Sequence, residues 1–309
     1  MNLYFAPLEG VTSCTYRTTH AKIFGGCEAY YAPFITPSDI ERFSIKSLRD
    51  VMPEKNQGID LKVQVLTCQS ESFKKFAEKV KSIGYNEVNI NLGCPSGTVV
   101  KKNRGSGFLR TPEELDRFLY EVYSENDIKI TIKTRAGFFN TSELDNLIEI
   151  YNKYPSVPLI IHPRSREDYY KGEPDNDAFK RAYEISKNKL CYNGNIFSRD
   201  DYIQISEEFP MLEGVMIGRG AIANPAIFRE IKGGAPLTTS ELIEFSDILI
   251  ENYTKVLVSE HYVLNKIKEI WLLMMLNFPE EKKILKAVKK ASKVMDIVTA
   301  VNNLPEIKR

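Results

Sequence analysis

The sequence carries no large excess of charge of either sign. Its 42 lysines and arginines balance its 41 aspartates and glutamates, which leaves a formal net charge of +1. Such a chain is not a polycation as a whole. Any binding to nucleic acid would therefore have to come from local basic patches.

Cysteines are few and far apart. The odd count of five and the wide spacing argue against a disulfide framework, and no pair has the spacing of a zinc knuckle or a C-x-x-C motif. Acidic residues and the three histidines form no cluster with metal-ligand spacing, so we expect no metal and an organic cofactor. Free thiols are typical of a reducing compartment, and we expect a cytoplasmic protein. The cysteines are Cys14, Cys27, Cys68, Cys94 and Cys191.

Long apolar runs are also missing. The first residues, "MNLYFAPLEG", have no basic segment and no apolar stretch of the kind that forms a signal peptide, so we expect none. No stretch approaches the roughly 20 apolar residues that a membrane span needs. The run "WLLMML" at 271–276 is typical of a buried helix, and we expect no membrane partner.

Short apolar runs, in contrast, recur eight times and alternate with helical patterns. This alternation predicts a parallel sheet, and eight strands are the number that closes a (β/α)₈ TIM barrel. A doubly wound open sheet is the alternative, but the first run ends in "APLEGVT", without the G-x-G-x-x-G of that fold. The helical patterns include 71–84, 111–125 and 141–154. The expected strands lie within 2–9, 28–35, 61–67, 87–93, 129–135, 158–164, 190–196 and 214–220.

The chain is expected to divide after the eighth strand and its helix. We predict a barrel domain over 1–234 and a small all-helical domain over 235–309, joined at Gly233 and Gly234. Expected helix N-caps are Thr111 before Pro112, Thr141 before Glu143, and Thr239 or Ser240 at the start of the second domain.

Polar residues and glycines gather where the predicted strands end. In a barrel these carboxyl ends form one rim, and that rim holds the active site. Each residue alone is most simply explained as part of an ordinary turn or as a satisfied polar group. Only their convergence on one rim favours a functional site. The set comprises Ala6, Pro7, Gln64, Asn89, Cys94, Lys133, Arg135, His162, Arg164, Asn193, Gly194, Asn195, Gly218, Arg219 and Gly220.

The chemistry of this rim suits a flavin. Backbone amides of "GRG" at 218–220, with the Arg219 side chain and the helix that Asn224 or Pro225 begins, could bind a phosphate. Lys133 could face the ring edge where negative charge develops on reduction. Gln64 and Asn193 offer amides to a planar ring, and His162 could bridge ring and phosphate or orient the substrate.

Cys94 is expected to be an acid. A free thiol with a pKa near 8.5 is mostly protonated at neutral pH and can donate a proton to a carbanion. A nucleophile would need a neighbouring base, and no local Cys–His motif provides one. The remaining alternative is an inert buried thiol.

Several of these blocks together resemble the tRNA-dihydrouridine synthase family. They are "APLEGVT", "NINLGCPS", "VVKKNRGSGFLRTPEEL", "IKTRAGF", "IIHPRSREDYYKGEPD", "CYNGNI" and "GVMIGRGAIANPAIF", in order from about residue 3 to 231. The resemblance implies a barrel that binds FMN and reduces a uridine in tRNA to 5,6-dihydrouridine, with NADPH as the electron donor. Two positions depart from the family pattern, Thr67 where a glycine is frequent and Asn195 where an aspartate is common.

The resemblance also implies roles for individual residues. Hydride goes to uracil C6 while Cys94 protonates C5, and Asn89 helps to hold the uracil. Arg135, Arg164 and Arg166 would meet the substrate. FMN would be bound by Ala6, Pro7, Leu8, Gln64, Lys133, His162, Asn193, Gly194, Asn195, Gly218 and Arg219.

Two basic segments are candidates for binding the RNA backbone. A uridine stacked in RNA must be extruded to reach a pocket, and phosphate contacts offset that cost. The loop with Lys101, Lys102 and Arg104 follows Cys94 closely. The second segment is expected to be an amphipathic helix with Ile284, Val288, Ala291 and Met295 on its other side; a solvated lysine-rich face is the alternative. Its lysines are Lys282, Lys286, Lys289, Lys290 and Lys293.

Two other functions fit parts of the pattern. A flavin barrel could reduce a small pyrimidine or enone, although such a substrate needs neither basic segment. A barrel without catalysis could simply bind RNA, although Cys94, Lys133 and His162 argue against it. We expect a monomer, and the sequence does not indicate which tRNA position is reduced.

Overall fold

Eight parallel strands close into a barrel in the computed structural model, which describes residues 1–37, 48–125 and 127–307. Each strand pairs with the next along the chain, and β8 returns to pair with β1, so the sheet has no free edge. The predicted TIM barrel and all eight predicted strands are confirmed. The strands are β1 (Asn2–Phe5), β2 (Ala29–Tyr31), β3 (Leu61–Val65), β4 (Glu87–Leu92), β5 (Lys129–Gly137), β6 (Leu159–Ser165), β7 (Leu190–Tyr192) and β8 (Gly214–Ile217).

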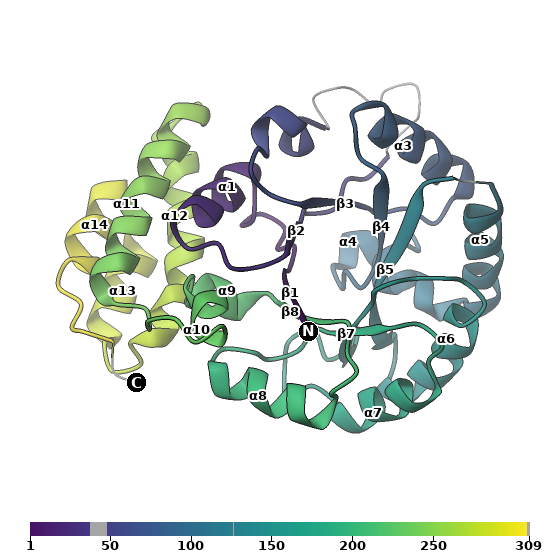
Figure 1. The fold of residues 1–309 in the computed structure, drawn as a ribbon. Coiled ribbons are helices and arrows are strands. Elements are labelled where there is room, and N and C mark those ends of the chain that lie inside the picture. Colours follow the sequence, from purple (N-terminus) through teal and green to yellow (C-terminus); the bar gives the residue numbers. More distant parts are fainter. Residues whose placement is uncertain (38–47, 126, 308–309) are drawn as a thin grey trace.

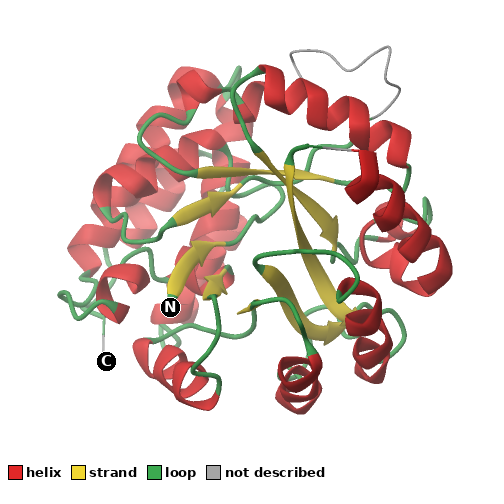
Figure 2. Cartoon of the chain, turned by 45° about the vertical axis from the view of Figure 1, so that its right-hand side comes forward, coloured by secondary structure: helices red, strands yellow, loops and turns green. Residues whose placement is uncertain are grey.

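Helices surround the strands and cover the outer face of the barrel (Figure 2). Their sequences are amphipathic: in α3 the buried residues include Phe73, Phe76, Ala77 and Val80, which share one helical face. The barrel helices are α1 (Cys14–Ile23), α3 (Ser70–Ser82), α4 (Gly97–Val100), α5 (Pro112–Glu125), α6 (Leu144–Tyr151), α7 (Asn176–Ile185), α8 (Arg199–Glu208), α9 (Arg219–Ala223) and α10 (Ile227–Ile231). Short 3₁₀ turns are η2 (Arg49–Val51), η3 (Pro53–Lys55), η4 (Gly105–Arg110) and η5 (Thr141–Glu143).

Two of the predicted helix N-caps lie one or two residues away from the expected position. The side chain of Asn140, not that of Thr141, caps the turn into α6, because the Thr141 hydroxyl bonds to Asp175 instead. The second domain begins with Thr238 as N-cap, in a capping box with Glu241. The Thr239 hydroxyl is used elsewhere, since it donates to the Pro305 carbonyl oxygen.

The residues after the barrel form a group of helices at one side of it (Figure 1). Helix α11 packs on α1, and α12 packs on α9. Trp271 of α12 is fully buried and donates its indole N–H to Ser246 at 2.7 Å. The helices are α11 (Thr239–Val256), α12 (Glu260–Met274), the 3₁₀ turn η6 (Met275–Asn277), α13 (Lys282–Lys290) and α14 (Val294–Val301).

One hydrophobic core is continuous from the barrel into this helical group. Leu3 and Phe228 of the barrel belong to the same cluster of buried side chains as Trp271 and Ile297 of the appended helices. The boundary between two domains at residue 234 therefore stays a prediction from the sequence. None of the helices within the three described ranges has the length and apolarity needed to cross a membrane.

Candidate active site

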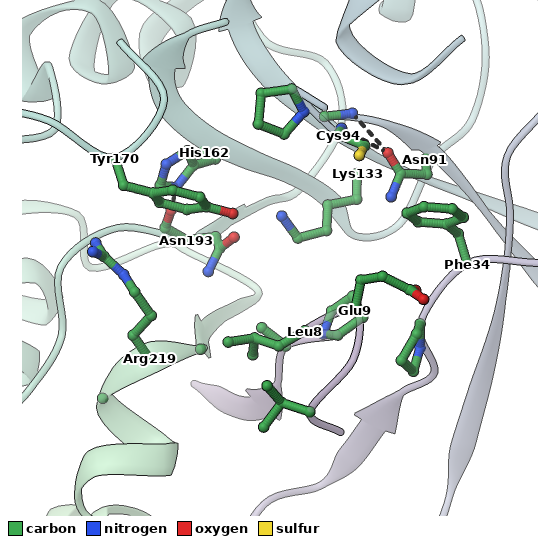
Figure 3. Close-up of a pocket in the computed structure, with 18 of the residues that line it drawn as sticks. Leu8, Glu9, Phe34, Asn91, Cys94, Lys133, His162, Tyr170, Asn193 and Arg219 are labelled. Atoms are coloured by element: carbon green, nitrogen blue, oxygen red, sulfur yellow. Dashed lines mark hydrogen bonds between the residues drawn. The ribbon is translucent and has the colours of Figure 1, made fainter. Parts of the chain in front are cut away.

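A cavity of about 490 Å³ opens at the carboxyl ends of the strands. Twelve of the residues that were expected at the rim line it, and Figure 3 shows how their side chains converge. They come from the carboxyl-terminal parts of β3, β5 and β6 and from the loops that follow β1, β4, β7 and β8. The twelve are Ala6, Pro7, Gln64, Cys94, Lys133, Arg135, His162, Asn193, Gly194, Gly218, Arg219 and Gly220, and Leu8, which was expected to bind FMN, lines the cavity as well.

The pocket has two chemically different ends (Figure 3). One end holds the Tyr170 ring and the Arg219 guanidinium, which lies 4.8 Å from the centroid of that ring. The other end holds Cys94 and the Phe34 ring, and Lys133 projects between the two ends. A single long ligand could therefore meet cations at one end and a thiol at the other.

Lys133 carries its charge in the middle of the cavity without a partner. Among the described residues, no hydrogen bond or ion pair holds its Nζ. Burial and, to a lesser extent, the Arg135 charge lower the pKa of this amine from 10.5 to about 8, against opposing effects of Cys191 and Cys94. The amine is thus available to a negatively charged ligand atom.

His162 is a neutral side chain of the pocket that donates one hydrogen bond and accepts another. Its Nδ1 lies 2.5 Å from the Asn193 carbonyl oxygen, and its Nε2 lies 3.3 Å from a guanidinium nitrogen of Arg164. The carbonyl accepts and the guanidinium donates, which assigns the ring proton to Nδ1. Burial, together with the charges of Arg135 and Lys133, holds the pKa of His162 well below 6.5.

Hydrogen bonds from two neighbouring segments hold the loop that carries Cys94. Asn91 Oδ1 accepts hydrogen bonds from the backbone N–H groups of Gly93 (3.0 Å) and Cys94 (2.9 Å), as drawn in Figure 3. The Cys94 carbonyl accepts from Ser106 N (3.1 Å) and Oγ (2.8 Å). Gly105, at a φ of 56°, packs so closely on Cys94 that a Cβ there would lie 2.8 Å from the Cys94 carbonyl oxygen.

Cys94 is held in its protonated form. Burial raises the pKa of the thiol above 9.0, and this effect exceeds the opposing influences of a backbone hydrogen bond from Ser96 and of the Arg135 and Lys133 charges. A thiol at the pocket wall with a raised pKa suits a proton donor and not a thiolate nucleophile.

The prediction for Asn89 needs correction. Asn89 is fully buried below the cavity, where it accepts from Gln64 Nε2 (2.8 Å) and donates to Thr131 Oγ1 (3.0 Å), so it does not reach the pocket. Asn91, two residues nearer the rim on the same face of β4, lines the pocket instead and donates to Gln64 Oε1 at 2.7 Å. The alternation of "NIN" puts both side chains on one face, and only their depth separates them.

Arginines 135, 164 and 166 are mostly engaged within the protein. Arg135 lines the pocket, but its Nε and Nη1 donate to the carbonyls of Gly93, Ser165 and Tyr169. Arg164 is buried and donates to the carbonyls of Lys171 and Gly172 and to Asn195. Arg166 pairs with Glu167 at 2.7 Å. These contacts support roles in holding the loops, and direct contact of the three with substrate stays a prediction.

The loops after β7 and β8 meet at the arginine end of the pocket. Asn195 lies behind the lining and accepts from both Arg219 (3.0 Å) and Arg164 (3.2 Å), so an amide oxygen serves as acceptor at this position. Glycine is required at two neighbouring positions: a Cβ at Gly194 would lie 2.2 Å from the Tyr192 hydroxyl, and one at Gly220 would lie 1.8 Å from the Ile196 carbonyl oxygen. Two short helices follow: α9 begins at Arg219, directly after β8, and α10 begins at Ile227, close to the helix start that was expected at Asn224 or Pro225.

The predicted basic residues lie outside the pocket. Lys101 and Lys102 are exposed, and the loop that carries them and Arg104 folds beside Cys94. The amphipathic helix is present as α13 but ends at Lys290, because Ala291 is extended. Met295 is exposed, and not on a buried side as predicted. Four exposed lysines of α13 form no ion pair with a carboxylate among the described residues: Lys282, Lys286, Lys289 and Lys290. Lys293, at the N-cap of α14, is also exposed, but its backbone N–H donates to the Asp296 carboxylate at 2.9 Å.

Other residues of the lining were not predicted. Glu9 and Tyr170 stand within blocks that the sequence already marked, "APLEG" and "DYYKG", and could have been found there. Glu269, Leu272 and Leu273 come from α12, and no sequence signal connects them to the pocket. The remainder are Val11, Pro33, Phe34, Asn91, Gly93, Pro95 and Phe197. Within the described part of the chain, no group of three or more His, Cys, Asp or Glu side chains is placed to hold a metal ion.

The structure resembles solved enzymes at low sequence identity, which shows a shared fold. Histamine dehydrogenase from Rhizobium sp. 4-9 matches with a TM-score of 0.56 at 12% identity, over 84% of this chain and 49% of that one. The old yellow enzyme from Trypanosoma cruzi matches with a TM-score of 0.53 at 11% identity, over 76% of this chain and 89% of that one.

Sequence comparison gives a more specific result. A tRNA-dihydrouridine synthase B of Pseudomonas putida is 29% identical over 264 residues, 81% of this chain and 75% of that protein. A probable tRNA-dihydrouridine synthase 1 of Synechocystis sp. is 26% identical over 230 residues, 74% of this chain and 63% of that protein. The family model described as dihydrouridine synthase (Dus) matches residues 4–306. Because this match spans nearly the whole chain, the protein belongs to the dihydrouridine synthase family.

Proposed function

We propose that this protein binds FMN in the barrel pocket and reduces a uridine of tRNA to 5,6-dihydrouridine. The observation that carries the proposal is that one pocket holds both a protonated thiol, that of Cys94, and the Lys133 ammonium, with which no described residue pairs. Family membership and the relatives' names support the choice of tRNA as substrate.

The residues of the pocket fit a flavin mononucleotide. A cavity of about 490 Å³ lies within the roughly 300–1,000 Å³ typical of cofactor and ligand sites. Gly194 and Gly218 present bare backbone to the cavity, and the Lys133 amine provides an uncompensated positive charge in its centre. Arg219 provides a second cation at one end, suited to a phosphate.

Each group of the chain then has a chemical task. A flavin bound and reduced here would supply the hydride for uracil C6. Cys94 donates its proton to C5, and the clamp formed by Asn91 and Ser106 keeps the Cys94 loop in one position. Lys133 stabilises the negative charge that develops at the edge of the flavin ring. His162, locked by Asn193 and Arg164, maintains the floor of the site.

We further propose that NADPH supplies the electrons, and that the enzyme works as a cytoplasmic monomer. The lysines of α13 and the loop of Lys101, Lys102 and Arg104 bind the RNA backbone. These surfaces are exposed and basic, as binding to phosphates requires.

An anaerobic reoxidation experiment tests the function. The purified protein is reduced with NADPH under nitrogen, unmodified tRNA is added, and the flavin absorbance is followed while the product is analysed for dihydrouridine. We expect a yellow protein that tRNA reoxidises with formation of dihydrouridine. Reoxidation by a small enone but not by tRNA would favour a small-molecule reductase, and a colourless protein that binds tRNA would contradict flavin catalysis altogether.

The Cys94→Ala variant separates the chemistry from the binding. We expect it to keep its flavin spectrum and its reduction by NADPH, and to lose about 10²- to 10⁴-fold in the tRNA-dependent reoxidation rate, as is typical for removal of a general acid. Loss of bound flavin in this variant would mean that Cys94 has a structural role.

A further inference from the structure

The Cys94 end of the pocket is rich in hydrogen-bond donors. Asn91 uses its Oδ1 on two backbone N–H groups and one amide hydrogen on Gln64, which leaves one N–H available. Lys133 adds an ammonium in the neighbouring position, since Asn91 and Lys133 are paired in register on β4 and β5. Both groups can donate to the ligand, and neither can accept from it.

The Glu9 carboxylate is a hydrogen-bond acceptor at this end of the pocket. Glu9 lines the cavity, and its side chain extends toward the side where Phe34 lies (Figure 3). No hydrogen bond or ion pair to it is formed by the described residues. Burial raises the pKa of Glu9, which opposes the effect of the Lys266 charge, and the carboxylates of Asp50 and Glu269 add to the increase.

The position of Glu9 is defined by the turn that carries it. The Leu8 carbonyl accepts from the N–H groups of Val11 and Thr12, and Gly10 takes a φ of 82°. The Lys266 ammonium of α12 donates to the Gly10 carbonyl and so ties the turn to the appended helices. Glu9 is therefore presented at the tip of a braced turn.

Uracil needs one acceptor between two donors. Its pairing edge has carbonyl oxygens at C2 and C4 and an N–H at position 3, and an extruded base is read along this edge. We propose that Glu9 accepts the hydrogen bond of uracil N3–H and so selects for uridine, while Asn91 and Lys133 serve the carbonyl oxygens. The inference rests on the proposed function and adds a residue that discriminates among bases.

The second carboxylate of the lining is placed differently. Glu269 lies against the backbone of the turn, where a Cβ at Gly10 would be 3.5 Å from its Oε2. The Glu9 charge acts on the Cys94 thiol and raises its pKa. Glu9 is thus the acceptor that faces the reacting end.

A double substitution, one in the protein and one in the RNA, tests this contact. Once the reactive position is mapped, a tRNA with N3-methyluridine at that position is compared with unmodified tRNA on wild-type enzyme and on Glu9→Ala. The readout is kcat/KM, and the visible spectrum of each variant confirms that flavin is bound. With unmodified tRNA, loss of a hydrogen bond to a charged group predicts a decrease of about 10- to 100-fold for Glu9→Ala.

The two changes should not be additive. N3-methylation should slow the wild-type enzyme strongly and the Glu9→Ala enzyme hardly at all, because the hydrogen bond is already lost. The matched control is Glu269→Ala, for which the ratio of the two substrates should stay at the wild-type value. Equal effects of N3-methylation on wild-type and Glu9→Ala enzymes would overturn the inference.

Glu9→Gln distinguishes the hydrogen bond from a charge effect. The amide keeps an acceptor oxygen, so we expect a smaller loss than for Glu9→Ala. If Glu9 acted only through the pKa of Cys94, both variants would lose the same activity and shift the alkaline limb of the pH profile equally, which would contradict base reading. A wild-type enzyme that binds flavin but reduces no uridine would overturn the proposed function itself.

Discussion

Lys133 shows at the scale of one residue how function and stability compete. Its ammonium lies in a pocket where no described carboxylate pairs with it, and the protein lowers its pKa from 10.5 to about 8. Nothing in the fold requires this charge. It is explained by a ligand whose negative charge it stabilises, and we therefore expect it to destabilise the protein alone.

Lys133→Met should raise the stability of the flavin-free protein. The change in pKa corresponds to at most about 3 kcal/mol at neutral pH, and water in the pocket reduces this, so we expect a gain of about 1–2 kcal/mol in the free energy of unfolding. Urea denaturation of the two flavin-free proteins measures it. The same variant should lose its tRNA-dependent activity.

The pH dependence checks the sign of this effect. The folded-state pKa lies below the unfolded one, so the cost of the charge is complete below pH 8 and disappears as the pH rises toward 10.5. The advantage of Lys133→Met should therefore vanish at high pH. An advantage of the same size at pH 7 and pH 10 would point to better packing instead of removal of a buried charge.

The sequence predicted which strand carries each site residue, but not how deep in the barrel the residue lies. The pattern of β4 identified an inward face with two asparagines, and the depth of each along the barrel axis decided which one meets a ligand. Asn89 is sealed by Gln64 and Thr131, whereas Asn91 is open to the cavity. This depth depends on the stagger of neighbouring strands, which residue types alone do not reveal.

At the scale of secondary-structure elements, a close backbone contact between two loops sets the shape of the pocket end that holds Arg219. Helix α9 begins directly after β8, and its Gly220 lies against the loop after β7, where a Cβ would be 1.8 Å from the Ile196 carbonyl oxygen. A rigid backbone atom cannot move aside as a side chain can. This close approach brings Arg219 and Asn195 within hydrogen-bond distance.

Gly220→Ala should therefore separate the two loops. We expect a loss of about 1–3 kcal/mol of stability or more, as for other overpacked sites, together with weaker flavin binding. Calorimetric unfolding and titration with FMN measure the two effects. Gly97→Ala is the matched control, because no atom lies within 4 Å of its added Cβ; an equal loss in both variants would contradict the steric argument.

Strands and helices were well predicted because their periodicity is strong. Buried parallel strands are nearly continuous runs of apolar residues, and the barrel helices show clear amphipathic faces. The exact helix starts were less accessible. Thr238 and Thr239 both suit an N-cap, and only the tertiary bond from Thr239 to Pro305 decides between them.

The appended helices complete the pocket at the scale of the whole molecule. Helix α12 contributes Glu269, Leu272 and Leu273 to the lining, and its Lys266 holds the turn that carries Glu9. An amphipathic pattern shows that a helix packs on something but not on what, so this wall could not be predicted from the sequence. Helix α12 thus connects the pocket with α13, the helix that we propose binds RNA, because α13 packs on α12.

The lysines of α13 allow a test of whether the appended helices also bind RNA. Lys286 and Lys290 are exposed and lack carboxylate partners among the described residues, on a chain with a net charge of only +1. Replacing both with glutamate should weaken tRNA binding at least about tenfold at low salt and reduce the slope of log K against log salt by about 1.5. NADPH oxidation should not change.

The control is the same charge reversal on the barrel, Lys75→Glu with Lys79→Glu on α3. Both pairs are spaced i,i+4 and change the net charge equally. Apart from position they differ in the exposed ion pair of Lys75 with Glu71 at 3.3 Å, which contributes little to stability, and in the partial burial of Lys79. If α13 contacts phosphates, the α3 variant keeps the wild-type salt slope, since that slope counts the counterions released at the contact. Equal loss of affinity in the two variants would mean that general charge, and not this helix, attracts the RNA, and the appended helices would then act only as the wall of the pocket.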